Sequence, residues 1–153
     1  MKNSEITKLL ALLGHCNYND SNKREFARLA KKLLRAVNAQ LNLDADIRFC
    51  AGGIAVSGEA ILHADKVYVQ VSADRRDPGI MYRACNGRKD YTGMRNLWLP
   101  YGILQRDGIS ALVRAIAAVI PHLHECPKCG DILTCNDPRC AIPQEPIAEC
   151  GAH

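Results

Sequence analysis

Four cysteines near the carboxyl end of the chain are spaced as metal ligands. They lie in the stretch CPKCGDILTCNDPRC, at Cys126, Cys129, Cys135 and Cys140. A Cys-x-x-Cys pair followed by glycine lets two thiolates converge on one ion, and four thiolates make a closed tetrahedral site without a position for water. The spacing therefore predicts a structural zinc ion, whose binding would contribute folding energy to a segment too short for its own core.

The five residues CPKCG resemble the knuckle of zinc-ribbon and related zinc-finger proteins. The resemblance covers only this tail, and the second pair, Cys135 and Cys140, departs from the usual Cys-x-x-Cys spacing. The ligand set stays open, because another nearby residue could replace Cys135 or Cys140: His122, His124, Cys150 or His153. A group of reduced thiols without metal is the alternative. A redox Cys-x-x-Cys is disfavoured, because this pair follows a predicted helix and a proline, not a strand.

A second candidate site lies in the stretch MYRACNGRKDYTG, residues 81–93. Asn86 followed by Gly87 is typical of a two-residue type I′ turn between two strands. This turn would place Arg83 opposite Asp90 and Tyr82 opposite Tyr91. An Arg83–Asp90 pair across the strands would make the stretch an ordinary solvated hairpin.

Arg88 and Lys89 have no acidic partner in this predicted hairpin. Guanidinium and ammonium groups beside a tyrosine suit phosphate groups or the carboxylates of an acidic protein. The stretch therefore predicts a basic binding surface made of Arg83, Arg88, Lys89, Tyr91 and Arg95.

A further basic surface is predicted on a long amphipathic helix at residues 23–41. Its apolar residues follow the helical period: Phe26, Leu29, Ala30, Leu33, Val37 and Leu41. Four cations fall on the opposite face, within an arc of about 60°: Arg24, Arg28, Lys31 and Arg35. A helical face that is merely solvated is the alternative interpretation.

Two more helices are indicated by apolar periodicity. The first spans residues 4–13, and the last spans residues 108–120, where Asp107 is the expected cap and Arg114 the single charge. Asn22 with Glu25 resembles a capping arrangement for the long helix between them. The last helix is nearly all apolar, so we expect it to be buried against a sheet.

Residues 46–72 change to a period of two, which is typical of strands. Strands are predicted near residues 46–51, 53–57, 59–63 and 66–72, and residues 94–105 are expected to be irregular. The fold class is therefore α+β: two N-terminal helices, a mainly antiparallel sheet of five to six strands, a buried third helix and a small C-terminal zinc knuckle. We expect an α+β domain at residues 1–121 and the zinc-knuckle tail at residues 122–153.

Composition restricts the function classes. Residues 1–121 hold 18 Lys and Arg against 11 Asp and Glu, a net charge of +7, whereas residues 122–153 hold 2 against 5, a net charge of −3. No apolar run is long enough to cross a membrane, and the N-terminal residues are better explained as a helix than as a signal peptide. Clustered rather than dispersed cysteines favour a reducing cytoplasm.

No familiar enzyme motif is present. The chain lacks a serine nucleophile elbow, a P-loop and an HExxH motif, and Cys-Pro-Lys-Cys reverses the order that zinc deaminases use. The leading hypothesis is a non-enzymatic protein that binds nucleic acid or a nucleoprotein complex, such as an accessory protein of a phage or mobile element. The alternatives are an adaptor or inhibitor of an acidic protein, and an enzyme or binder acting on a phosphorylated ligand through Arg83, Arg88, Lys89 and Tyr91.

Overall fold

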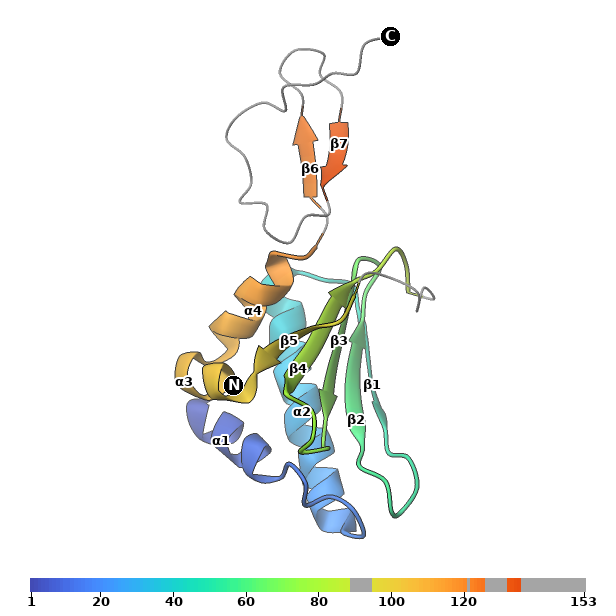
Figure 1. Ribbon diagram of the computed structural model, residues 1–153, viewed down its shortest axis with the longest axis vertical. Helices are drawn as coiled ribbons and strands as arrows, with labels where there is room; N and C mark the ends of the chain where they lie inside the picture. Colours follow the sequence, from blue (N-terminus) through green and yellow to red (C-terminus); the bar gives the residue numbers. More distant parts are fainter. Residues whose placement is uncertain (89–94, 121, 126–131, 136–153) are drawn as a thin grey trace.

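The computed structural model describes residues 1–88, 95–120, 122–125 and 132–135 of the 153-residue chain (Figure 1). Two helices precede a five-stranded sheet, two helices follow it, and a two-stranded hairpin lies near the carboxyl end. In chain order, the elements are α1 (Asn3–Ala11), α2 (Asp20–Leu41), β1 (Asp46–Cys50), β2 (Glu59–His63), β3 (Val67–Ser72), β4 (Gly79–Ala84), β5 (Leu97–Pro100), α3 (Tyr101–Asp107), α4 (Ile109–Ala117), β6 (His122–Glu125) and β7 (Ile132–Cys135).

The predicted α+β class is confirmed. The sheet is an antiparallel meander with the order β1-β2-β3-β4-β5, so each strand pairs with the next strand along the chain. Helices α1 and α2 confirm the two predicted N-terminal helices, and α4 confirms the predicted apolar helix. The sheet therefore contains the lower of the two predicted strand numbers.

Helix α2 begins earlier than its predicted cap. The side chain of Asn19 caps the helix by accepting a hydrogen bond of 2.9 Å from the backbone N–H of Asn22. The capping arrangement predicted at Asn22 and Glu25 is therefore wrong by three residues. Asn19 has the extended backbone conformation that a capping residue needs, and Asn42 ends the helix in the left-handed conformation with φ 48°.

The strand predicted at residues 53–57 is wrong. These residues belong to the connection between β1 and β2, where they form turns. Gly52 has φ 62°, which is incompatible with a strand. The backbone carbonyls of Gly53 and Val56 accept hydrogen bonds from the side chain of Lys23 on α2, not from a neighbouring strand.

The hairpin predicted around Asn86 and Gly87 is also wrong. Tyr82 pairs with Val69 on β3 and with Leu97 on β5, so both of its edges are taken and Tyr91 is not its partner. The strand that pairs with β4 must place an apolar side chain in the core beside Ile80, and Leu99 of β5 does so. The charged sequence that follows Gly87 offers no such residue. Lys89, Asp90 and Tyr91 lie outside the described residues.

The stretch at residues 94–105, expected to be irregular, contains both β5 and α3. Pro100 ends the strand and stands immediately before α3, because it lacks the N–H that the sheet needs but the first helical turn does not. Gly108, with φ 70°, separates α3 from α4. The cap predicted at Asp107 is therefore wrong: Asp107 ends α3, and its carboxylate is 2.8 Å from the Nε of Arg106.

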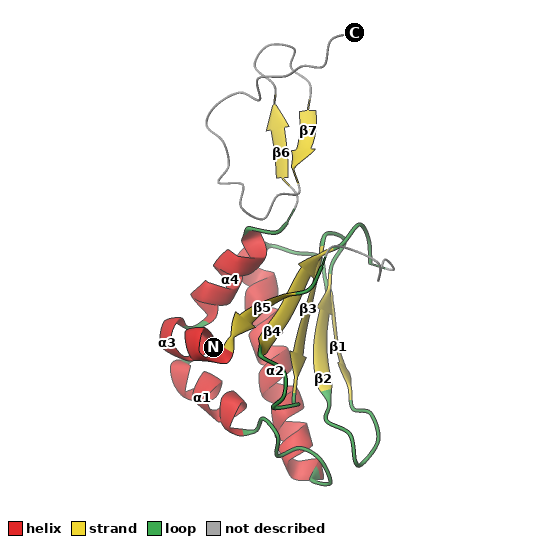
Figure 2. Ribbon diagram, in the orientation of Figure 1, coloured by secondary structure: helices red, strands yellow, loops and turns green. Residues whose placement is uncertain are grey.

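The helices α1, α2, α3 and α4 all lie to one side of the five-stranded sheet (Figure 2). One buried cluster joins the helices to the sheet. It includes Phe26 and Leu33 of α2, Leu62 and Val69 of the sheet, and Leu112 of α4. A separate buried cluster forms on the other sheet face, from Ile61, Tyr68, Met81 and Cys85. The sheet thus separates two environments, and a side chain on β4 reaches one or the other according to its register.

Within the described part of the chain, no helix has the length and apolar character needed to cross a membrane. The described residues near the carboxyl end are the strands β6 and β7, which pair in antiparallel fashion from His122 with Cys135 to Glu125 with Ile132.

Candidate functional site

Of the four predicted zinc ligands, Cys126, Cys129 and Cys140 lie outside the described residues, and Cys135 is the last residue of β7. Backbone pairing places Cys135 opposite His122. The opposite end of the hairpin, where Glu125 pairs with Ile132, is three residue pairs from Cys135. Among the described residues, no group of three or more His, Cys, Asp or Glu side chains is arranged to hold a metal ion.

Arg88 is paired with three carboxylates of its own chain, so it is not free to bind another anion. Its guanidinium lies 2.5 Å from Asp44, 3.2 Å from Asp65 and 3.9 Å from Asp46. The hydrogen bond to Asp44 raises the pKa of Arg88 further above its ordinary value. The prediction that Arg88 lacks an acidic partner is therefore wrong. Two of its partners lie between α2 and the start of β1, and the third is in the β2–β3 turn, all distant in sequence.

Arg83 stacks within the sheet surface. Its guanidinium carbon lies 5.1 Å from the centroid of the Tyr68 ring, a geometry that favours a cation–π interaction. The buried ring of His63 meets the same tyrosine edge-on, with centroids 5.2 Å apart. Arg83 is partly buried, and its Nε has no hydrogen-bond partner among the described residues. Arg83 thus contributes to a stacked cluster in the cross-strand row that also contains Asp46, one of the carboxylates that bind Arg88.

Three cations of the predicted α2 face are exposed or partly exposed. Arg24 and Arg35 are exposed, Lys31 is half-buried, and none of the three makes an ion pair with a described carboxylate. Arg28, the fourth, lies 2.8 Å from Glu25, which also binds Lys8 at 2.7 Å. We call Arg24, Lys31 and Arg35 the outward cations of α2.

The two predicted basic surfaces lie on opposite sides of the fold. The buried face of α2 packs against the sheet through residues such as Phe26 and Leu33, so Lys31 and Arg35 point away from the sheet, whereas Arg24 lines a cavity beside β1. Arg83 stacks on Tyr68, which belongs to the cluster on the sheet face not covered by helices. Arg95 is exposed just before β5. The candidates from the predicted hairpin and those from α2 therefore do not form one site.

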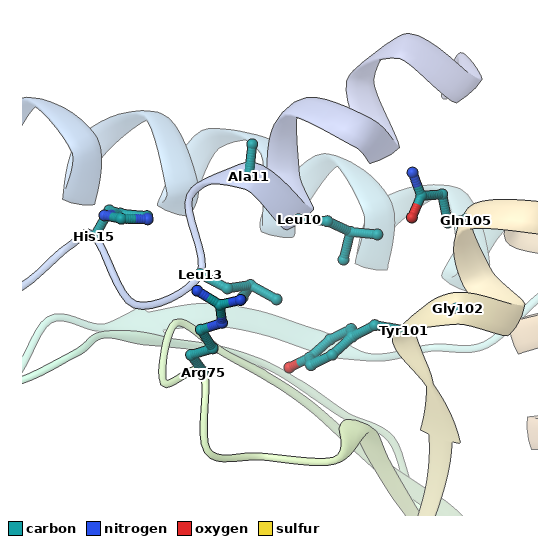
Figure 3. A pocket seen from close by; sticks show the side chains of 8 residues that line it. All are labelled: Leu10, Ala11, Leu13, His15, Arg75, Tyr101, Gly102 and Gln105. Atoms are coloured by element: carbon teal, nitrogen blue, oxygen red, sulfur yellow. The ribbon is translucent and has the colours of Figure 1, made fainter.

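A cavity of about 380 Å³ lies between α1 with the loop that follows it, the β3–β4 turn and α3 (Figure 3). Arg75 and Tyr101 lie side by side within it, next to Leu13. The Tyr101 hydroxyl is buried and has no hydrogen-bond partner among the described residues, and burial raises its pKa well above the ordinary value of 10.0. The lining holds one guanidinium but no nucleophile paired with a base, so the cavity suits binding rather than catalysis.

Lys23 has a structural role that was not predicted from the sequence. Its side chain is buried at 9% exposure, and its ammonium donates hydrogen bonds to the carbonyls of Ala51, Gly53 and Val56 at 3.1, 2.8 and 2.7 Å. The helical wheel contained the signal, because Lys23 shares the apolar face with Phe26 and Ala30. A cation on the buried face of a helix needs acceptors from elsewhere in the chain.

Comparison with known proteins gives no match: no family model, no curated protein and no solved structure is similar to this chain.

Proposed function

We propose that this chain is a small, cytoplasmic, non-enzymatic binding protein that engages nucleic acid, alone or in a nucleoprotein complex, through the exposed basic face of α2. The observation that carries the proposal is the set of outward cations, Arg24, Lys31 and Arg35, which have no carboxylate partner among the described residues. A polyanion would supply those partners. An accessory role for a phage or mobile element is compatible with such an activity.

The spacing of the outward cations suits a phosphate backbone. Arg24 and Arg35 are eleven residues apart on one helix, which corresponds to about 16 Å along its axis. Duplex DNA carries a phosphate about every 3.4 Å along each strand, so the stretch can meet several phosphates. Contacts of this kind position a protein on nucleic acid without reading its sequence. We therefore expect weak binding with little sequence preference.

This proposal moves the interface from the hairpin to the helix. Arg88 binds three carboxylates of its own chain, so it cannot bind a phosphate without losing them. Arg83 lies on the other side of the fold, and Lys89 and Tyr91 are outside the described residues. The phosphorylated-ligand alternative, which needs these four residues together, has the least support.

The experiment is a salt titration of binding to a labelled DNA duplex and to a single strand, followed by fluorescence anisotropy. Neutralising three phosphates predicts that the logarithm of the duplex affinity falls with the logarithm of salt at a slope of about −3. The variant Arg24→Gln/Lys31→Gln/Arg35→Gln removes the outward cations, and glutamine preserves helix propensity. We expect this variant to lose nearly all binding to both probes.

The matched control is Arg75→Gln/Arg76→Gln/Arg106→Gln, which makes the same change in net charge at three exposed arginines outside α2. It should bind almost as tightly as the natural protein. Equal losses in the two triple variants would mean that net charge, not the α2 face, causes binding. If neither probe binds at low salt, direct nucleic-acid binding is wrong and an acidic protein surface becomes the better candidate.

We also propose that the tail binds one structural zinc ion through Cys126, Cys129, Cys135 and Cys140. The spacing of the cysteines carries this proposal, and the antiparallel pairing of β6 with β7 is compatible with it. Because Cys135 is opposite His122, the ligand set needs separate substitutions. Elemental analysis should find about one zinc per chain, lost in Cys126→Ser/Cys129→Ser. Zinc retained in that variant would rule out this site.

A further inference from the structure

Three exposed apolar side chains lie together at one end of the molecule. Tyr18, Ile54 and Val56 have exposures of 77%, 74% and 54%, and they are three of the four large apolar residues exposed in the described part of the chain. Tyr18 belongs to the loop after α1, and the other two belong to the β1–β2 connection. The backbone N–H of Tyr18 donates to the carbonyl of Ile54 at 2.9 Å, which joins the two loops. We call these three side chains the apolar tip.

The backbone beneath the apolar tip is fixed by a buried cation. Lys23 donates to three carbonyls of the β1–β2 connection, including that of Val56. Its described partners are carbonyl dipoles, so the charge of Lys23 is used to hold this loop. A second bond, from the Ser57 hydroxyl to the Asn17 side chain at 2.9 Å, again joins the two loops. The apolar side chains are therefore presented on an ordered backbone.

The tip also contains backbone strain. Tyr18 has φ 57°, in the left-handed region that bulky residues seldom adopt. In the isolated protein the three side chains of the tip are exposed to solvent, so their packing does not offset the strain at Tyr18 or the ordering of the two loops. Such a preorganised surface is typical of a binding site.

A small cavity lies next to the tip. It has a volume of about 290 Å³, and its apolar lining comes from Ala27, Phe49 and Ala51. Asp20 and Arg24, both exposed, line the same cavity. One end of the molecule thus presents a protruding apolar group, a recess, one acid and one base.

The charges around the tip identify the partner. Residues 16–19 and 51–58 contain no charged side chain, which disfavours an acidic partner or an anionic lipid surface. Asp20 and Arg24 carry opposite charges, so the end of the molecule is complementary to itself. A surface that meets its own copy about a two-fold axis must have this property.

We propose that the partner is a second copy of this chain, and that the tip of each copy enters the cavity beside the tip of the other. Asp20 of one copy then faces Arg24 of the other. Three side chains and a shallow recess give an interface well below the size of stable dimers. The association is therefore weak, and because Arg24 is also one of the outward cations of α2, it competes with nucleic-acid binding at that residue.

Sedimentation equilibrium under reducing conditions tests the proposal over roughly 10 µM to 1 mM protein. The weight-average mass should rise from 16.8 kDa towards twice that value. Tyr18→Gly removes the ring, and glycine accepts the positive φ, so this variant should fold with an unchanged or higher melting temperature and remain monomeric. Trp98→Thr, which removes the fourth exposed residue from a strand on the other edge of the sheet, should associate like the natural protein.

Exchange of charges provides a second test that does not depend on the ring. Asp20→Arg and Arg24→Asp should each weaken association, and a mixture of the two variants should restore it, because Arg then faces Asp across the interface. A protein that stays monomeric over the whole range contradicts the proposal. So does equal association of the natural protein and Tyr18→Gly, because association would then use another surface.

Discussion

Arg88 and the outward cations of α2 differ in the origin of their nearest carboxylates. Arg88 binds Asp44, Asp46 and Asp65, which the sheet brings together from positions 23 to 44 residues away. Arg24, Lys31 and Arg35 are on the outer face of a helix, where none of them makes an ion pair with a described carboxylate. A cation therefore becomes structural or available according to the topology around it, and local sequence composition does not distinguish the two cases.

The largest expected effect concerns the pairing of β4 with β5. These two strands lie on either side, in the sequence, of the segment that contains Arg88. A Cβ added at Gly79 would overlap the carbonyl group of Leu99, which is backbone and cannot move unless β5 shifts. Gly79→Ala should therefore cost about 3 kcal/mol of unfolding free energy, as severe overpacking does. Urea unfolding measures this cost.

Gly87→Ala is the matched control. Gly87 does not have a positive φ, and a Cβ there would meet nothing within 4 Å. Its replacement should be neutral or stabilising by about 0.5 kcal/mol. If Gly87→Ala were the more damaging of the two substitutions, the type I′ hairpin predicted from the sequence would be favoured over the observed pairing.

A smaller effect is expected at Arg88. Arg88→Gln separates three carboxylates from their shared cation and leaves them close to one another. Because all of these groups are in contact with solvent, the loss of stability should be modest and should shrink as salt is added. Arg95→Gln, at an exposed arginine without a described partner, should change nothing. Unfolding curves at low and high salt give the comparison, and equal curves for the two variants would show that Arg88 is not structural.

The smallest expected effect is the pH dependence that Glu25 causes on α2. Hydrogen bonds from Arg28 and then from Lys8 lower the pKa of Glu25 from its ordinary value of 4.5 to about 2. A carboxylate with a lowered pKa stabilises the fold above its ordinary value, and this contribution is lost as the pH falls towards about 2.

Glu25→Gln should remove that contribution. The natural protein and the variant should therefore differ more in thermal stability at about pH 7 than at about pH 2. A difference that grows as the pH falls would contradict the assignment of Glu25 as the shared partner of Lys8 and Arg28.

The sequence predicts those parts of the fold that depend on local patterns. The period of 3.6 from Phe26 to Val37 identified α2 and the face that carries Arg24, Arg28, Lys31 and Arg35, since both depend only on helix geometry. Alternation at Val67, Val69 and Val71 identified β3 in the same way. The α+β class follows from these elements.

The errors arise where distant residues decide the structure. A local turn signal at Asn86 and Gly87 was overridden because β4 pairs with the apolar strand Leu97–Pro100. The partners of Arg88 come from two other connections, and Lys23 binds carbonyls about 30 residues away. Neither a window of sequence nor a charge count contains these contacts, so the sequence alone did not distinguish between the two predicted basic surfaces.

The central claim is that the outward cations of α2 bind a polyanion. The most direct measurement is the salt dependence of duplex binding for the natural protein, for Arg24→Gln/Lys31→Gln/Arg35→Gln and for Arg75→Gln/Arg76→Gln/Arg106→Gln. We predict a slope of about −3 for the natural protein and the control, and almost no binding for the α2 variant. Undiminished binding by the α2 variant, or no binding by any of the three proteins at low salt, would contradict the claim.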